Sequence, residues 1–313
     1  MALDSATSSR AAFRGPLIVT GMHRSGTSML SRLLDRLGVF QGHDVRGGNH
    51  EAALFYTINE WLLRQAGAAW DRPLPVNDLT ADPNLVALTA RYVGKHLESA
   101  QLVDYLGPTR WVRHRRLANL PMPWGFKDPR TVFTLPVWFE LFPDARVLYI
   151  HRNGVDVAAS LERRTLERLR RSEDTDGGRL SRRARFSPRP RVEGHLALSL
   201  RCRTLRGGFE LWKEYCEEGE RQLERLPADR KLMLAYEDLA SDPAKHLAAI
   251  CRLAGIEEPP RMRDLVADLV RRDRVDGFRR QARLSAFHET VRNEPCMVRL
   301  GYGEASPVRH EAV

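Results

Sequence analysis

The sequence predicts a three-layer α/β/α fold, in which a mainly parallel central sheet carries helices on both faces. Three observations support this expectation. Of the 313 residues, 42% are hydrophobic, which is typical of a globular protein. Short apolar runs alternate with longer segments of helical periodicity, a pattern that favours a parallel sheet with crossover helices. The first apolar run leads through a glycine-bounded turn into a helical segment, which is the arrangement of an anion-binding loop.

The first half of the chain supplies most of these elements. Residues 17–21 (LIVTG) form a short apolar run expected to be a strand, and residues 28–37 place apolar side chains at helical spacing. The short stretch 124–127 (WGFK) precedes a buried strand expected at 145–151 (ARVLYIH). Helices are expected near residues 52–65, 83–103 and 132–142, and a further helix opens at 154–161.

The composition changes abruptly after residue 161. Eleven arginines lie between Arg163 and Arg191, together with glycines and prolines that break regular structure, so residues 162–194 are interpreted as an arginine-rich insertion. The pattern then returns, with a helix at 196–226, a strand at 231–236 and a helix at 244–253. We therefore predict a single domain over residues 1–313, with a flexible N-terminus at 1–16 and a C-terminal extension at 257–313 that closes the site.

Charge and cysteine content narrow the function classes. The 50 Lys+Arg and 40 Asp+Glu give a net charge of +10, which fits nucleic acid, an acidic membrane surface or an anionic small molecule as partner. No apolar run approaches the roughly 18 residues of a transmembrane helix, and residues 1–16 lack the apolar stretch of a secretory signal, so a cytoplasmic location is predicted. Four scattered cysteines without a C-x-x-C motif indicate reduced thiols and no structural zinc.

The glycine-bounded loop at residues 21–28 (GMHRSGTS) nearly matches the nucleotide-triphosphate pattern G-x-x-x-x-G-K-[ST]. Thr27 stands where that pattern has lysine. Because the lysine reaches the β- and γ-phosphates, its absence argues against a kinase or NTPase, while the loop can still hold a terminal phosphate. The loop therefore favours a nucleotide with a different 5′ group.

Four segments form a recognisable series: residues 16–34 (PLIVTGMHRSGTSMLSRLL), 126–130 (FKDPR), 147–161 (VLYIHRNGVDVAASL) and 236–239 (YEDL). In this order they resemble the sulfotransferase family, whose sulfuryl donor is 3′-phosphoadenosine 5′-phosphosulfate (PAPS). The first segment resembles the family's 5′-phosphosulfate loop and the third its 3′-phosphate motif, and LGYG at 300–303 is similar to the end of bacterial members. The resemblance implies a P-loop-like α/β fold, sulfuryl transfer to an acceptor hydroxyl or amine, and 3′-phosphoadenosine 5′-phosphate (PAP) as product.

The resemblance also implies roles for individual residues. Thr27 and Ser28, together with the backbone amides of Ser25 and Gly26, are expected to hold the 5′-phosphate. Arg152 and Ser160 would offer a guanidinium fork and a hydroxyl to the 3′-phosphate. Arg24 and Lys127 would stabilise the bridging oxygen and the sulfuryl oxygens during in-line transfer, and no metal is implied.

A general base must remove the acceptor proton. Animal cytosolic members place a histidine two residues after the second lysine, but Pro129 occupies that position here. Many bacterial members carry a Gly-aromatic-x-Glu segment after the loop, and residues 48–51 (GNHE) resemble a divergent copy. Glu51 is therefore the predicted base. His50 is its competitor, because an unperturbed imidazole titrates closer to neutral pH.

Other functions remain open at this stage. A kinase-like phosphotransferase is disfavoured by Thr27, and a nucleic-acid-binding protein would use the arginine-rich segment, which lacks interleaved aromatic residues. A sulfotransferase-fold protein could also bind nucleotide without catalysis. For the main hypothesis we expect a small-molecule, glycan or lipid acceptor, with peripheral membrane contact possible and no nucleic acid. Residues 163–191 would then form an electrostatic lid for an anionic acceptor.

Overall fold

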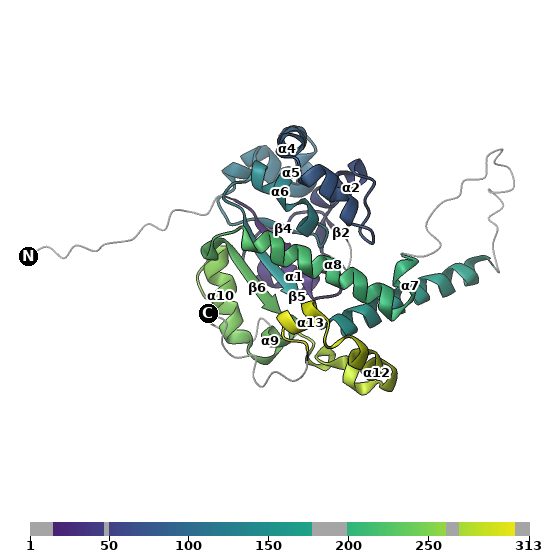
Figure 1. The fold of residues 1–313 in the computed structure, drawn as a ribbon. Coiled ribbons are helices and arrows are strands. Elements are labelled where there is room, and N and C mark those ends of the chain that lie inside the picture. The colour runs from purple at the N-terminus through teal and green to yellow at the C-terminus, as the bar shows by residue number, and fades with distance from the viewer. Residues whose placement is uncertain (1–14, 47–49, 177–198, 261–268, 304–313) are drawn as a thin grey trace, which may run out of the picture.

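The computed structural model describes residues 15–46, 50–176, 199–260 and 269–303. Within these ranges the chain forms a four-stranded parallel sheet in the order β4-β1-β5-β6 (Figure 1). The strands are β1 (Leu17–Thr20), β4 (Gly125–Lys127), β5 (Arg146–His151) and β6 (Lys231–Ala235). The predicted α/β class with a parallel sheet is confirmed. The expectations for residues 1–14 and 177–194 lie outside the described residues.

Helices cover both faces of the sheet, because successive side chains of a strand point to opposite sides. Ile18 and Tyr149 belong to one core, whereas their neighbours Val19 and Ile150 belong to the other. The helices that close the first core are α2 (Ala53–Gln65), α3 (Asn77–Thr80), α4 (Pro83–Leu97), α5 (Leu102–His114), α6 (Thr131–Leu141), α7 (Gly154–Asp176), α8 (Leu205–Glu224), α12 (Ala282–Val291) and α13 (Pro295–Arg299). Those that close the second core are α1 (Thr27–Arg36), α9 (Tyr236–Ser241) and α10 (Pro243–Ala254).

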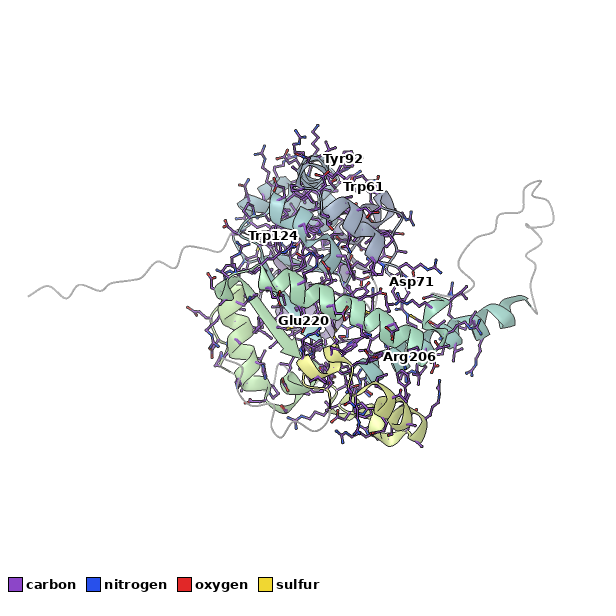
Figure 2. The ribbon with its side chains drawn as sticks, in the orientation of Figure 1. Trp61, Asp71, Tyr92, Trp124, Arg206 and Glu220 are labelled. Atoms are coloured by element: carbon purple, nitrogen blue, oxygen red, sulfur yellow. The ribbon has the colours of Figure 1, made fainter. Side chains whose placement is uncertain are left out.

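Aromatic packing ties the helices that follow α1 to strand β4. Phe55 of α2 stacks on Phe126 of β4 with ring centroids 4.1 Å apart. Between α2 and α4, Trp61 stacks on Tyr92 with ring centroids 4.8 Å apart (Figure 2). Large aromatic side chains contribute much of the apolar area buried in a core. The end of β4, which carries Lys127, is therefore held by a well-packed layer.

Three helix boundaries differ from those predicted. The helix expected at 154–161 continues to Asp176, so residues 162–176 of the predicted insertion are helical. This part is rich in Leu, Glu and Arg, which are good helix formers, and Arg283 donates two hydrogen bonds to Glu162, at 2.8 and 2.6 Å. The helix expected from residue 196 begins at Leu205, where Thr204 caps it. The single helix expected at 83–103 is divided between α4 and α5.

Candidate active site

The loop between β1 and α1 is shaped by two glycines with positive φ. A Cβ on Gly21 (φ 134°) would lie 2.1 Å from the carbonyl oxygen of Ile150, and one on Gly26 (φ 109°) would lie 2.8 Å from the ring of Tyr236. Only glycine fits such positions, so the loop backbone packs closely against β5 and α9. Thr27 is the first residue of α1, where the helix dipole and the free amides favour an anion.

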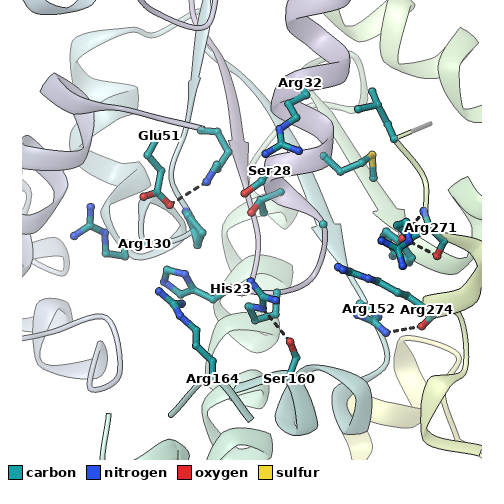
Figure 3. A pocket seen from close by; sticks show the side chains of 18 of the residues that line it. His23, Ser28, Arg32, Glu51, Arg130, Arg152, Ser160, Arg164, Arg271 and Arg274 are labelled. Carbon is teal, nitrogen blue, oxygen red and sulfur yellow. Dashed lines mark hydrogen bonds and ion pairs between the residues drawn. The ribbon is translucent and has the colours of Figure 1, made fainter. Parts of the chain in front are cut away.

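A cavity of about 540 Å³ lies where β1, β4 and β5 end (Figure 3). It brings together most of the residues predicted from the sequence, namely Arg24, Gly26, Thr27, Ser28, Glu51, Lys127, Arg152 and Ser160. Two predicted residues do not line it. Ser25 is fully buried, and His50 lies outside the lining although it precedes Glu51. The chain thus converges on one site from both halves of the sequence.

One side of the cavity is formed by the residues after β5. The Arg152 guanidinium donates a hydrogen bond to Asp156 Oδ2 at 2.9 Å and another to the carbonyl oxygen of Arg274. Its Nε is buried and has no hydrogen-bond partner among the described residues. Ser160, two turns further along α7, accepts a hydrogen bond from Arg24 Nε at 2.9 Å. This side therefore offers a buried N–H donor and a hydroxyl to an anion.

The C-terminal part of the chain adds cations that the sequence analysis missed. Arg271 and Arg274 line the cavity on the same side as Arg152 (Figure 3). The basic run RRDR at residues 271–274 is visible in the sequence, but its spacing does not connect it with β5. Tyr302 anchors the end of this segment, because its hydroxyl donates to Glu237 Oε2 and also contacts His151 Nδ1, both at 2.8 Å.

The opposite side of the cavity holds a buried ion pair. Strand β3 (Glu51–Ala52), paired with β2 (Val45–Arg46), brings Glu51 to the end of β4, where Lys127 Nζ donates to Glu51 Oε1 at 2.9 Å. The Glu51 side chain is only 8% exposed and the Lys127 side chain only 1%. Burial raises the pKa of Glu51, although the positive charge of Lys127 opposes this, and burial lowers the pKa of Lys127. Glu51 is therefore a stronger proton acceptor than an ordinary carboxylate.

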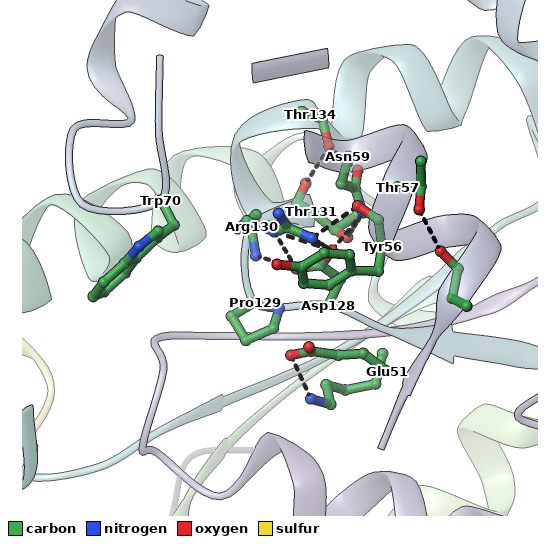
Figure 4. A network of polar contacts seen from close by, with 12 residues as sticks. Glu51, Tyr56, Thr57, Asn59, Trp70, Asp128, Pro129, Arg130, Thr131 and Thr134 are labelled. Carbon is green, nitrogen blue, oxygen red and sulfur yellow. Dashed lines mark hydrogen bonds and ion pairs between the residues drawn. The ribbon is translucent and has the colours of Figure 1, made fainter. Parts of the chain in front are cut away.

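A polar network holds the backbone that follows Lys127. Asp128 accepts hydrogen bonds from Arg130 Nε at 3.0 Å and from Asn59 Nδ2 at 3.1 Å (Figure 4). Asn59 Oδ1 in turn accepts a hydrogen bond from Trp138 Nε1 at 2.9 Å. All four of these side chains are buried. Because a buried network of satisfied hydrogen bonds is rigid, Lys127 and the residues beside it keep a fixed position.

His23 forms part of the wall between the loop and α8. Its ring meets Trp70 edge-on at 5.1 Å and Tyr215 at 5.8 Å. Burial, followed by the charges of Arg130 and Lys127, lowers the pKa of His23 well below its usual value, so the imidazole is neutral at pH 7. Its Nε2 is buried without a hydrogen-bond partner in the described ranges.

The part of the chain that the structure describes contains neither a metal-binding cluster nor a membrane-spanning helix. No group of three or more His, Cys, Asp or Glu side chains there is arranged to hold a metal ion. In the same ranges, no helix is long and apolar enough to cross a bilayer. The four cysteines are buried and free.

Comparison with known families assigns the chain. The model of the Sulfotransferase family matches residues 16–184, more than half of the 313 residues, and this span contains the glycine loop, Lys127 and Arg152. The protein belongs to the sulfotransferase family. The match agrees with the family that the sequence motifs indicated.

Solved structures of low sequence identity are also similar to this chain. The sulfotransferase domain from the curacin biosynthetic pathway is 14% identical, with a TM-score of 0.44, over 87% of this chain and 82% of that one. Sulfotransferase STF9 from Mycobacterium avium is 19% identical, with a TM-score of 0.42, over 90% and 77%. The sulfotransferase from Alicyclobacillus acidocaldarius is 17% identical, with a TM-score of 0.40, over 88% and 99%. A comparison with curated proteins gave no match.

Proposed function

We propose that this protein transfers the sulfuryl group of PAPS to an acceptor hydroxyl or amine by in-line displacement, without a metal ion. The observation that supports the proposal is a single cavity lined by the glycine loop, by Arg152 with Ser160, and by the buried Glu51–Lys127 pair. PAPS carries one anionic group at its 5′ end and another at its 3′ end. A cavity with cations on two sides, joined by a phosphate loop, suits such a molecule.

The donor would be bound mainly by hydrogen bonds and charge. The loop amides at Gly26 and the hydroxyls of Thr27 and Ser28 would hold the 5′-phosphate at the positive end of α1. Arg152 and Ser160 would hold the 3′-phosphate. The buried Nε of Arg152, which has no partner in the described residues, supports this assignment because a buried donor is costly to leave unbonded.

The chemical step breaks the bond between sulfur and the bridging oxygen of the 5′-phosphate and forms a bond between sulfur and the acceptor oxygen. Glu51 Oε would take the acceptor proton, a role supported by its raised pKa. Once Glu51 is neutral, the charge of Lys127 is no longer balanced by its partner. Lys127 and Arg24 would then stabilise the negative charge on the departing phosphate oxygen, and PAP would be the product.

The cellular location belongs to the same proposal. The four cysteines are buried and free, which fits a reducing compartment. We place the protein in the cytoplasm on this basis.

A calorimetric titration tests the donor assignment. We expect PAP to bind, whereas ATP with magnesium and a DNA oligonucleotide bind much more weakly or not at all. Transfer of labelled sulfuryl from PAPS to a panel of phenols, glycans, lipids and peptides then tests the reaction. Tight binding of ATP or of the oligonucleotide without binding of PAP would overturn the proposal. PAP binding without transfer to any acceptor class would favour a nucleotide-binding protein that lacks catalysis.

A further inference from the structure

Arg164 is a cavity residue that the proposed donor site does not use. It lies one helical turn after Ser160 on α7, so the two side chains share a face of the helix, and both line the cavity. Arg130, Arg152 and Arg271 also line the cavity, and each pairs with an aspartate. Arg164 has no hydrogen-bond or ion-pair partner within the described residues. A guanidinium in this position is available for a ligand.

The surroundings of Arg164 favour an anionic ligand. Its charge is the first cause, after burial, of the lowered pKa of Arg24, and it also helps to lower the pKa of His23. Like charges therefore interact across this part of the cavity, and Glu51, the acidic residue among the described lining residues, is already paired with Lys127. An anion beside Arg164 would relieve this repulsion.

The position of Arg164 assigns it to the acceptor rather than to the donor. Figure 3 shows Arg164 projecting toward His23, on the same side of the cavity as Glu51 and Arg130. Arg152, which belongs to the proposed 3′-phosphate site, and Arg274 lie on the other side of the view, and Ser160 lies between Arg164 and Arg152. The proposed base, Glu51, and the Arg164 guanidinium thus face the same part of the cavity.

Two aromatic side chains complete the part of the cavity that Glu51 and Arg164 face. Trp70 and Tyr56 line the cavity and are both half-buried. The carbonyl oxygen of Trp70 accepts a hydrogen bond from Tyr215 at 2.8 Å, which fixes the backbone at Trp70, and Tyr56 lies beneath the Arg130 guanidinium at 3.9 Å from ring centroid to Cζ. Figure 4 shows Trp70 set apart from Tyr56, with Pro129 between their positions. Partly exposed aromatic side chains that line a polar cavity can pack against the flat face of a ring-shaped ligand.

We propose that the acceptor is a hydroxyl-bearing ring that also carries an anionic group, such as a carboxylate, and that Arg164 binds this group while Trp70 packs against the ring. The inference rests on the proposed sulfuryl transfer and names the acceptor class of the same site. The cavity of about 540 Å³ must also accept the donor, so the recognised unit is a single ring. Phenolic acids and uronic acids share this chemistry.

Binding to the PAP-loaded protein tests the inference. The probes are para-hydroxyphenylacetate and its neutral amide, with glucuronate and glucose as a second pair that distinguishes an aromatic from a sugar ring. A charge-assisted hydrogen bond contributes about 1.5 to 3 kcal/mol, so at least one acid should bind roughly 10- to 150-fold more tightly than its neutral partner. Equal affinity for acid and neutral compound in both pairs, or no binding of any probe, would overturn the inference.

Two variants locate the effect. Arg164→Gln should bring the ratio of acid to amide affinity close to one, and Arg164→Lys should restore part of the preference. Arg163→Gln removes the same charge from the preceding residue, which is exposed and lies outside the described lining, so it should keep the preference. If Arg164→Gln instead weakens PAP binding and keeps the preference, the guanidinium serves the donor and the inference fails.

The two proposals fail in different ways. If PAP does not bind to the unaltered protein, the proposed function is wrong. If PAP binds and sulfuryl transfer occurs, but neutral acceptors are used as well as their acids, the proposed function stands and the acceptor class is wrong.

Discussion

Replacing Arg152 by alanine is the sharpest test of the donor site. The side chain is 10% exposed, donates to Asp156 at 2.9 Å and to the Arg274 carbonyl, and keeps a buried Nε without a partner in the described residues. A 3′-phosphate would gain at least one charge-assisted hydrogen bond from that Nε, worth about 1.5 to 3 kcal/mol. We therefore expect Arg152→Ala to weaken PAP binding by about 2 kcal/mol, which is roughly 30-fold.

The assay compares PAP with AMP, which lacks the 3′-phosphate. Calorimetry should show the loss for PAP and almost none for AMP. Arg206→Ala, at an exposed position of α8 outside the cavity lining, is the matched control and should bind both nucleotides normally (Figure 2). Equal losses for PAP and AMP would mean general damage to the site, and unchanged PAP affinity would refute the 3′-phosphate role of Arg152.

Three further predictions concern the base, the loop and the C-terminal anchor. Glu51→Gln should lower kcat about 100-fold or more while PAP affinity is nearly kept, and normal turnover of this variant would show that Glu51 is not the base. The unaltered enzyme should gain activity as pH rises through the raised pKa of Glu51, because the ionised carboxylate accepts the proton. Gly26→Ala should abolish PAP binding in calorimetry, whereas Gly38→Ala, also at positive φ but in open space, should retain it. Tyr302→Phe should lower the free energy of unfolding by about 1 to 3 kcal/mol in denaturant titrations, because Glu237 loses a buried donor; unchanged stability would contradict the anchor.

Local patterns predicted the first strand, the glycine loop and the first helix because the signals lie next to one another in the chain. The strand expected at residues 17–21 appears as Leu17–Thr20, and the helix expected at 28–37 as Thr27–Arg36. The strand expected at 145–151 is likewise β5. A short buried strand is determined largely by its own apolar run, so little depends on distant residues.

Features that depend on tertiary contacts were missed. The Arg271 and Arg274 side chains reach the cavity because the Tyr236 hydroxyl is hydrogen-bonded to the Arg271 backbone and the Arg152 guanidinium to the Arg274 carbonyl oxygen. No local pattern records these contacts. The continuation of α7 was missed because the insertion was placed at the change in composition after residue 161, whereas the glycines that break regular structure come only at 177–178 and arginine is a good helix former.

The buried contact between Tyr302, Glu237 and His151 has a consequence for the order in which the protein matures. The ribosome produces β1, the glycine loop and β5 first, and the segment with Arg274 and Tyr302 emerges well after them. The carbonyl that contacts Arg152 cannot be in place until residue 274 has left the ribosome, and the hydroxyl that joins β5 to α9 cannot be in place until residue 302 has done so. A nascent chain would therefore acquire its full affinity for the proposed nucleotide donor only after residue 302 has emerged, so donor binding would report whether this segment has folded.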